Sequence, residues 1–177
     1  MTLRRLLGIE LPVVQAPMAG VQGSALAIAV SNAGGLGSLP CAMLSADALA
    51  AELAALRTGT SKPFNVNFFC HAAPTPDERR EAAWRAQLGP YYDEFGIDAA
   101  AIPAGPGRAA FGVEAADAID AFRPAVVSFH FGLPSAGLLA RVKSWGSKVL
   151  SSATAVKASF AFDQNPCCQR SSPMVSL

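Results

Sequence analysis

The sequence lacks a charge excess of either sign. Its 14 basic side chains balance 13 acidic ones, and neither kind forms a stripe or a tail. Nucleic-acid-binding domains carry a basic face and disordered segments carry high net charge, so both classes are disfavoured. No run approaches the ~18 apolar residues of a membrane-spanning helix. The opening stretch MTLRRLLGIELPVV, interrupted by Glu10 and Pro12, is unlike a secretory signal. We therefore expect a cytoplasmic protein with no membrane or nucleic-acid partner.

Cysteine and histidine are also scarce. The four cysteines form no CxxC pair, and two of them are adjacent, which is a poor arrangement for one zinc ion. They are Cys41, Cys70, Cys167 and Cys168. We expect reduced thiols and no metal site. The two histidines are His71 and His130.

What the sequence does have is a regular alternation of short apolar runs and amphipathic segments. The apolar runs predict strands over 11–20, 35–40, 62–71, 125–132 and 148–154. Helices are predicted over 24–35, 45–59, 75–89, 112–124 and 135–146. Strands that alternate with helices through short connections form right-handed βαβ units and a parallel sheet. The predicted fold is therefore α/β, with about five parallel strands flanked by helices.

The last stretch differs from this repeat. Residues 158–177 show neither a helical nor a strand period, and they hold two cysteines and a cluster of serine and proline. We expect one domain over 1–157 and an irregular tail over 158–177.

Helix-start residues support the predicted helices. Ser24 and Ser45 are placed to cap two of them, because a serine hydroxyl accepts from the first free amides of a helix. Thr75 and Glu78 form a capping box for a third, with Pro76 at its first helical position.

The first predicted strand ends in QAPMAG, residues 15–20. Pro17 has no amide hydrogen, so the strand ladder cannot continue through it, and Gly20 allows a close bend. Two interpretations fit this stretch: an ordinary turn between a strand and a helix, or a turn whose backbone faces a flat aromatic ligand.

The next strand contains GGLGS over 34–38. This stretch lacks the GxGxxG spacing of a dinucleotide site, so its glycines are interpreted as helix caps and packing positions.

The third predicted strand contains NVNFF. Strand alternation places Asn65, Asn67 and Phe69 on one face. Two buried amides need partners, because an unpaired buried polar group costs about 1–3 kcal/mol. Loop groups or a heteroaromatic ligand could supply them.

SFHFGLP, residues 128–134, places His130 where an apolar strand ends. In a β/α barrel all strands open at one face, where the chemistry occurs. Pro17, Asn67 and His130 would then converge there. We expect His71 to be a solvated loop histidine.

Taken in order, QAPMAG, GGLGSLP, NVNFF, SFHFGLP and KVLSSAT resemble the nitronate monooxygenases, formerly called 2-nitropropane dioxygenases. The resemblance covers about residues 8–157. It implies part of a TIM (β/α)8 barrel that binds FMN, with the backbone of Ala16, Pro17 and Met18 beside the flavin and Asn67 hydrogen-bonded to it. In that family a nitronate gives an electron to FMN, and O2 completes its conversion to a carbonyl compound and nitrite.

The resemblance also implies a catalytic role for His130. It would take the α-proton of a nitroalkane, or hold the anion of a nitronate. A histidine has an unperturbed pKa of about 6.5, so both protonation states are accessible near neutrality. The electron transfer itself belongs to the flavin.

The sequence departs from the family after Lys157. Family members are about twice as long, and the missing part carries a flavin-contacting glutamine and the Gly-rich loops that hold the FMN phosphate. We therefore expect impaired activity, with an inactive fragment that self-associates through exposed strand edges as one alternative. A related flavin-dependent enoyl-carrier-protein or quinone reductase is another.

Overall fold

The computed structural model describes residues 2–72, 75, 77–102, 109–152 and 175–176. The chain divides into two compact units. One consists of Met1–His71 together with Arg108–Leu177, and the other is the insertion Ala72–Gly107. The insertion leaves the first unit after the third predicted strand and returns before the fourth, so the first unit alone contains the sheet.

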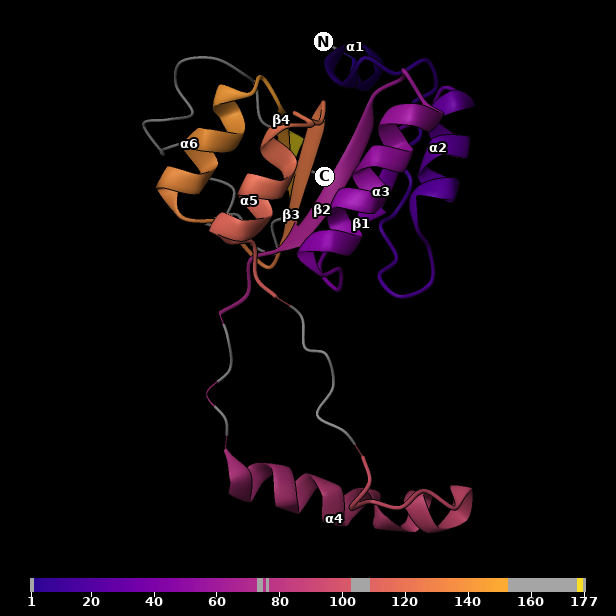
Figure 1. Cartoon of the computed structure of the whole chain (residues 1–177), viewed down its shortest axis with the longest axis vertical. Coiled ribbons are helices and arrows are strands. Elements are labelled where there is room, and N and C mark those ends of the chain that lie inside the picture. Colours follow the sequence, from indigo (N-terminus) through magenta and orange to yellow (C-terminus); the bar gives the residue numbers. More distant parts are fainter. Residues whose placement is uncertain (1, 73–74, 76, 103–108, 153–174, 177) are drawn as a thin grey trace. The chain divides into compact units, whose positions relative to one another are not determined.

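The sheet of the first unit has five strands in chain order, and every neighbouring pair is parallel (Figure 1). The strands are β1 (Gly37–Pro40), β2 (Phe64–Phe69), β3 (Val126–His130), β4 (Lys148–Ser151) and β5 (Val175–Ser176). The predicted parallel α/β fold is confirmed. Most of the predicted tail lies outside the described residues, but its two residues in β5 pair with Leu150 and Ser151 of β4.

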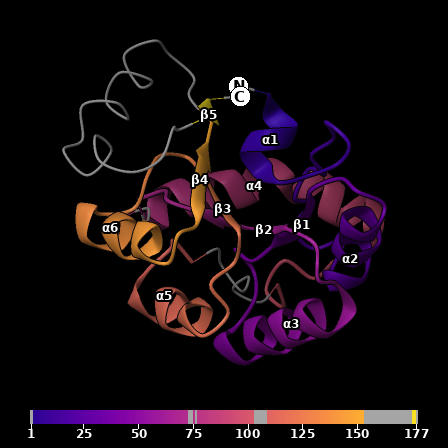
Figure 2. The same cartoon turned by 90° about the horizontal axis from the view of Figure 1, so that it is seen from above.

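Helices cover one face of this sheet, which we call the outer face. Seen along the strands, they form an arc around it (Figure 2). They are α2 (Ser24–Asn32), α3 (Ala46–Gly59), α5 (Val113–Asp120) and α6 (Ala136–Ser144). The opposite, inner face carries the side chains of Asn65, Asn67 and Ser128, since register partners in a parallel sheet point to the same side.

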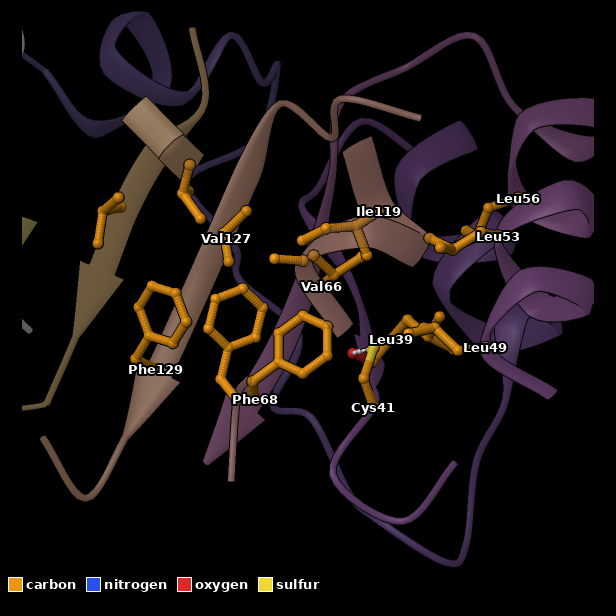
Figure 3. Close-up of a cluster of buried hydrophobic side chains, with 14 of the residues drawn as sticks. Leu39, Cys41, Leu49, Leu53, Leu56, Val66, Phe68, Ile119, Val127 and Phe129 are labelled. Atoms are coloured by element: carbon orange, nitrogen blue, oxygen red, sulfur yellow. Dashed lines mark hydrogen bonds between the residues drawn. The ribbon is translucent and has the colours of Figure 1, made fainter. Parts of the chain in front are cut away.

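The main hydrophobic core lies between the outer face and the helices (Figure 3). Val66, Phe68 and Phe129 project from the strands into it, and Leu53 and Leu56 of α3 pack against them. All five side chains are buried, so this layer supplies most of the hydrophobic stabilisation of the unit.

One glycine sets the distance between α2 and β1. A Cβ on Gly37 would lie 1.9 Å from the carbonyl oxygen of Ala27 and 2.7 Å from the hydroxyl of Ser31. No side chain fits there, which confirms the interpretation of this Gly-rich stretch as a packing feature.

The first predicted strand is reduced to a single bridge. Only Val14 pairs, with Leu36, and the predicted strand over 11–20 is wrong beyond that pair. The physical reason lies in Pro12 and Pro17, which have no amide hydrogen for a ladder and stand on either side of the bridge.

A short helix that the sequence analysis missed closes the amino end of the inner face. It is α1 (Leu3–Leu7), capped by the Thr2 hydroxyl and ended by Gly8 in the left-handed conformation. Its buried side chains and those beside them form a second apolar cluster with residues in or next to β1, β3 and β4. The members are Leu6, Leu7, Ile9, Leu36, Val126 and Leu150.

Two of the three predicted helix starts are corrected, and Ser45 is confirmed as the cap of α3. Helix α2 has Gly23 at its N-cap, and the Glu52 carboxylate accepts from the amide of Ser24 at 2.6 Å, so a side chain from α3 replaces the predicted serine cap.

The second compact unit is the insertion Ala72–Gly107. It contains α4 (Glu78–Phe95), whose N-cap is Asp77 rather than the predicted Thr75, because the Asp77 carboxylate accepts from two first-turn amides. The predicted end at residue 89 is also wrong: the helix continues through Pro90 to Gly96, which is left-handed. Pro76 lies outside the described residues. None of the described helices is both long enough and apolar enough to cross a bilayer.

Candidate active site

A cavity of about 320 Å³ opens on the inner face near the carboxyl ends of β3 and β4. Residues 14–17, which we call the Pro17 turn, line one side of it, and residues in or next to the strands line the rest. The lining comprises Val14, Gln15, Ala16, Pro17, Asn65, Ser128, Phe129, His130, Leu150, Ser151 and Ser152. Among the described residues, this lining includes no lysine, arginine, aspartate or glutamate.

A layer of buried polar side chains crosses the inner face beneath this cavity. The Ser128 hydroxyl of β3 accepts hydrogen bonds from the side-chain amides of Asn65 and Asn67, each at 2.9 Å. Asn65 donates a second bond to the Ser38 hydroxyl of β1 at 3.1 Å. The asparagines therefore find partners in neighbouring strands and not in loops, which was one of the two sources that the sequence suggested.

One atom of the layer has no partner. Asn65 is 2% exposed, and its Oδ1 is the one buried side-chain polar atom of the described residues that forms no hydrogen bond. Leaving a buried acceptor unpaired costs about 1–3 kcal/mol. Because Asn65 also lines the cavity, a ligand that donates an N–H or O–H there would remove this cost.

The Pro17 turn is held apart from β1 by a side chain. The Gln15 amide accepts from the backbone N–H of Ser38 at 3.1 Å and donates to the Ser38 carbonyl at 3.2 Å. The Gln15 side chain thus forms the two hydrogen bonds with Ser38 that the backbone of a neighbouring strand would otherwise form. Within the described part of the chain, the amides of Ala16 and Met18 form no ladder hydrogen bond, so this backbone stays available at the cavity.

His130 stands at the carboxyl end of β3 in a cluster of aromatic rings. Its ring centroid lies 6.2 Å from that of Phe69 and 6.3 Å from that of Phe131. His71 lies 6.2 and 6.4 Å from the same two rings. The predicted solvated loop histidine is therefore only partly exposed, because both phenyl rings pack against it.

The structure brings three of the five predicted site residues to one cavity. Ala16, Pro17 and His130 line it directly. Asn67 is not among the lining residues, but it is tied to Ser128, which is. Met18 is 44% exposed and is also not among them.

Sequence reasoning missed Ser128 as the centre of the polar layer. A signal was present, since strand alternation puts Ser128 on the same side as His130. It could not show that the register places Ser128 beside Asn67, which a single sequence does not specify.

The described cysteines are not suited to nucleophilic chemistry. Burial raises the pKa of the Cys41 thiol far above its usual range, and burial raises that of Cys70 to about 11. A thiol in this condition carries little thiolate at neutral pH and is a poor nucleophile. No cluster of metal-ligating side chains occurs among the residues that the structure describes.

A second cavity, of about 280 Å³, lies on the outer side near Cys41, Phe68 and Glu114. It carries no histidine, and its thiol is the buried one of Cys41. The inner-face cavity is therefore the candidate active site.

Comparison with known families identifies the chain. The family model described as nitronate monooxygenase matches residues 1–164. The chain belongs to the nitronate monooxygenase family. It is 43% identical over 157 residues to the nitronate monooxygenase of Paraburkholderia phytofirmans and 41% identical over 158 residues to that of Pseudomonas aeruginosa.

These relatives are considerably longer. The matches cover 84% and 85% of this chain but only 41% and 43% of the two relatives. The chain thus spans about two fifths of the length of the nitronate monooxygenases it matches.

Solved structures agree on the fold. The nitroalkane oxidase of Streptomyces ansochromogenes superposes with a TM-score of 0.76 at 32% identity, covering 93% of this chain and 46% of that one. FabK of Thermotoga maritima superposes with a TM-score of 0.64 at 23% identity, which supports the fold alone. The parallel sheet with its outer helices is part of a TIM (β/α)8 barrel, as the sequence predicts.

Proposed function

We propose that the chain carries the substrate-binding half of an FMN-dependent nitronate-oxidising site, located in the inner-face cavity. The observation that carries this proposal is the convergence of the Ala16–Pro17 backbone, the unpaired Oδ1 of Asn65 and the imidazole of His130 on one cavity. Family membership supports nitronate oxidation in general. The flavin, the oxidant O2 and the residue roles are what the family resemblance implies, and they are part of the proposal.

The residues present fit the ring system of a flavin. An isoalloxazine is flat and mostly apolar and carries a ring N–H, and the cavity offers an apolar turn at Pro17 and a buried acceptor at Asn65. Bound there, the flavin would supply the one-electron oxidation of the nitronate that no side chain of the site can perform.

The same residues do not fit the flavin's phosphate. A phosphate needs backbone amides at a helix start or charged donors, and none of the described residues that line the cavity is a lysine or an arginine. We therefore propose weak FMN binding and low activity in this chain. Exposed edges of its partial barrel would favour self-association.

His130 has the position and surroundings of an anion-binding group. Among the described residues no hydrogen bond or ion pair involves its ring, so no carboxylate competes for a protonated imidazole. In its protonated form the ring would attract a nitronate, and apolar walls would strengthen that attraction by excluding water. With a neutral nitroalkane the unprotonated ring would instead accept the α-proton. Neither role requires a membrane or a nucleic acid, and we place the protein in the cytoplasm.

The test is turnover by the full chain reconstituted with FMN. We expect nitrite release and O2 uptake with propionate 3-nitronate. With a neutral nitroalkane as the substrate, where His130 would accept the α-proton, His130→Gln should lower the rate by about 10²–10⁴, the usual contribution of a positioned acid or base. The matched control is His71→Gln, which changes the other histidine outside the cavity lining and should leave most of the rate. A flavin-loaded chain that releases no nitrite contradicts the proposal.

A further inference from the structure

The residue after His130 has an unusual backbone. Phe131 has φ of +65°, and Arg123 is the one other non-glycine residue with positive φ that the described ranges contain. A left-handed conformation is unfavourable for a residue with a Cβ, and for a bulky side chain it is rare. Such strain persists only where surrounding contacts impose it, and it concentrates at functional sites.

Contacts from the neighbouring strands impose it here. The Cys70 amide donates to the His130 carbonyl at 2.9 Å, which fixes the chain before Phe131. The Ser151 hydroxyl of β4 lies 3.1 Å from the Phe129 carbonyl and 3.4 Å from that of Gly132, which fixes the chain on both sides.

The strained backbone changes where the Phe131 ring points. If β3 continued, residue 131 would project to the face opposite His130. Instead, the Phe131 ring packs edge-on against Phe69, with centroids 5.0 Å apart, and both rings flank His130.

Burial does not explain this arrangement. The Phe131 side chain remains 66% exposed, so its hydrophobic contribution is small compared with that of a core phenylalanine. The unfavourable backbone conformation of Phe131 is thus kept although its phenyl ring contributes little to the hydrophobic core.

Few other contacts among the described residues orient the His130 ring. A functional imidazole is ordinarily oriented by a hydrogen bond from its second nitrogen. No such bond is formed among the described residues, which leaves the two phenyl rings as its packing neighbours at the cavity mouth.

We propose that Phe131 is a positioning residue for His130: its left-handed backbone turns its ring onto Phe69, and the two rings hold the imidazole in one orientation at the mouth of the cavity. The inference rests on the proposed function for the role of His130, but the orientation itself exists without flavin or substrate. The proposed nitronate oxidation does not depend on a strained residue at position 131, so the positioning role of Phe131 goes beyond the proposed function.

The experiment measures the side-chain rotamer of His130 in the full chain, without flavin, by three-bond couplings in NMR spectra. Phe131→Gly removes the ring and the strain together. We expect the His130 couplings to lose the values of a single rotamer and to become averaged, while the unfolding temperature stays the same or rises by about 2–4 °C. Phe131→Tyr keeps the ring and should keep the single rotamer. Phe131→Asn, which tolerates the left-handed backbone, is a second variant without the ring and should match the glycine variant.

The matched control is Arg123→Gly, which relieves the same kind of backbone strain outside the aromatic cluster and should leave the His130 couplings unchanged. A single His130 rotamer in both ringless variants would overturn the proposal, and so would averaging in the tyrosine variant. A large loss of thermal stability in both ringless variants would overturn it as well, because the ring would then serve the fold. A chain that binds no flavin contradicts the proposed function and leaves this result standing.

Discussion

Ser128→Ala is the substitution whose effect follows most directly from the polar layer. The Ser128 hydroxyl accepts from both Asn65 and Asn67. Removing it deletes two buried hydrogen bonds, worth about 1 kcal/mol each. Asn65 keeps its bond to Ser38, but Asn67 keeps only a long contact of 3.4 Å to the Ser128 carbonyl, so one buried donor is left poorly paired. That adds about 1 kcal/mol or more, for a total of about 3 kcal/mol.

Thermal unfolding followed by far-UV circular dichroism measures this loss. For a chain of this length about 3 kcal/mol corresponds to a decrease of about 6–12 °C in Tm. Ser144→Ala is the matched control, because its hydroxyl donates to a backbone carbonyl at an exposed position of α6 and should contribute less than about 0.5 kcal/mol. Adding Asn67→Val to Ser128→Ala should recover part of the stability by removing the poorly paired donor. A Tm for Ser128→Ala equal to that of the control would refute the reasoning.

The other predictions concern packing, cofactor and thiols. Gly37→Ala should abolish soluble expression, since its Cβ would overlap the Ala27 carbonyl, while Gly89→Ala on α4, where nothing lies within 4 Å, should fold normally. FMN and riboflavin should bind with equal affinity in fluorescence titrations, because the described residues that line the cavity include no cation to hold the phosphate; much tighter FMN binding would contradict that assignment. Iodoacetamide should modify Cys70 slowly at pH 8 and faster as the pH rises toward its pKa of about 11, while Cys41 stays protected in the folded chain; fast reaction of Cys70 at pH 8 would argue against its burial.

The sequence predicted the elements whose pattern is local. Helix α3 follows from the amphipathic segment that Ser45 caps, and β2 follows from the alternation around Val66. Parallel pairing followed from the order of strands and helices. These features depend on periodicity and capping, which a single sequence displays.

Features that depend on distant partners could not be predicted. The Ser24 amide is bonded to Glu52 from another helix, and α1 owes its place to apolar residues in or next to β1, β3 and β4. Pro12 and Pro17 are visible in the sequence, but it does not show that the Gln15 side chain occupies the ladder position at Ser38.

The same division holds for the candidate site. His130 and Pro17 were predicted from their positions at strand ends, and the structure places both at one cavity. The unpaired oxygen of Asn65 and the left-handed Phe131 arise from register and turn geometry, which no spacing in the sequence encodes.

A crystal structure of the chain soaked with riboflavin tests the central claim most directly. The account predicts the flavin ring in the inner-face cavity, beside the backbone of Ala16 and Pro17, with a ring N–H donating to Asn65 Oδ1. A ring bound in the outer cavity beside Cys41 and Glu114, or an inner cavity left without flavin at saturating riboflavin, would contradict it.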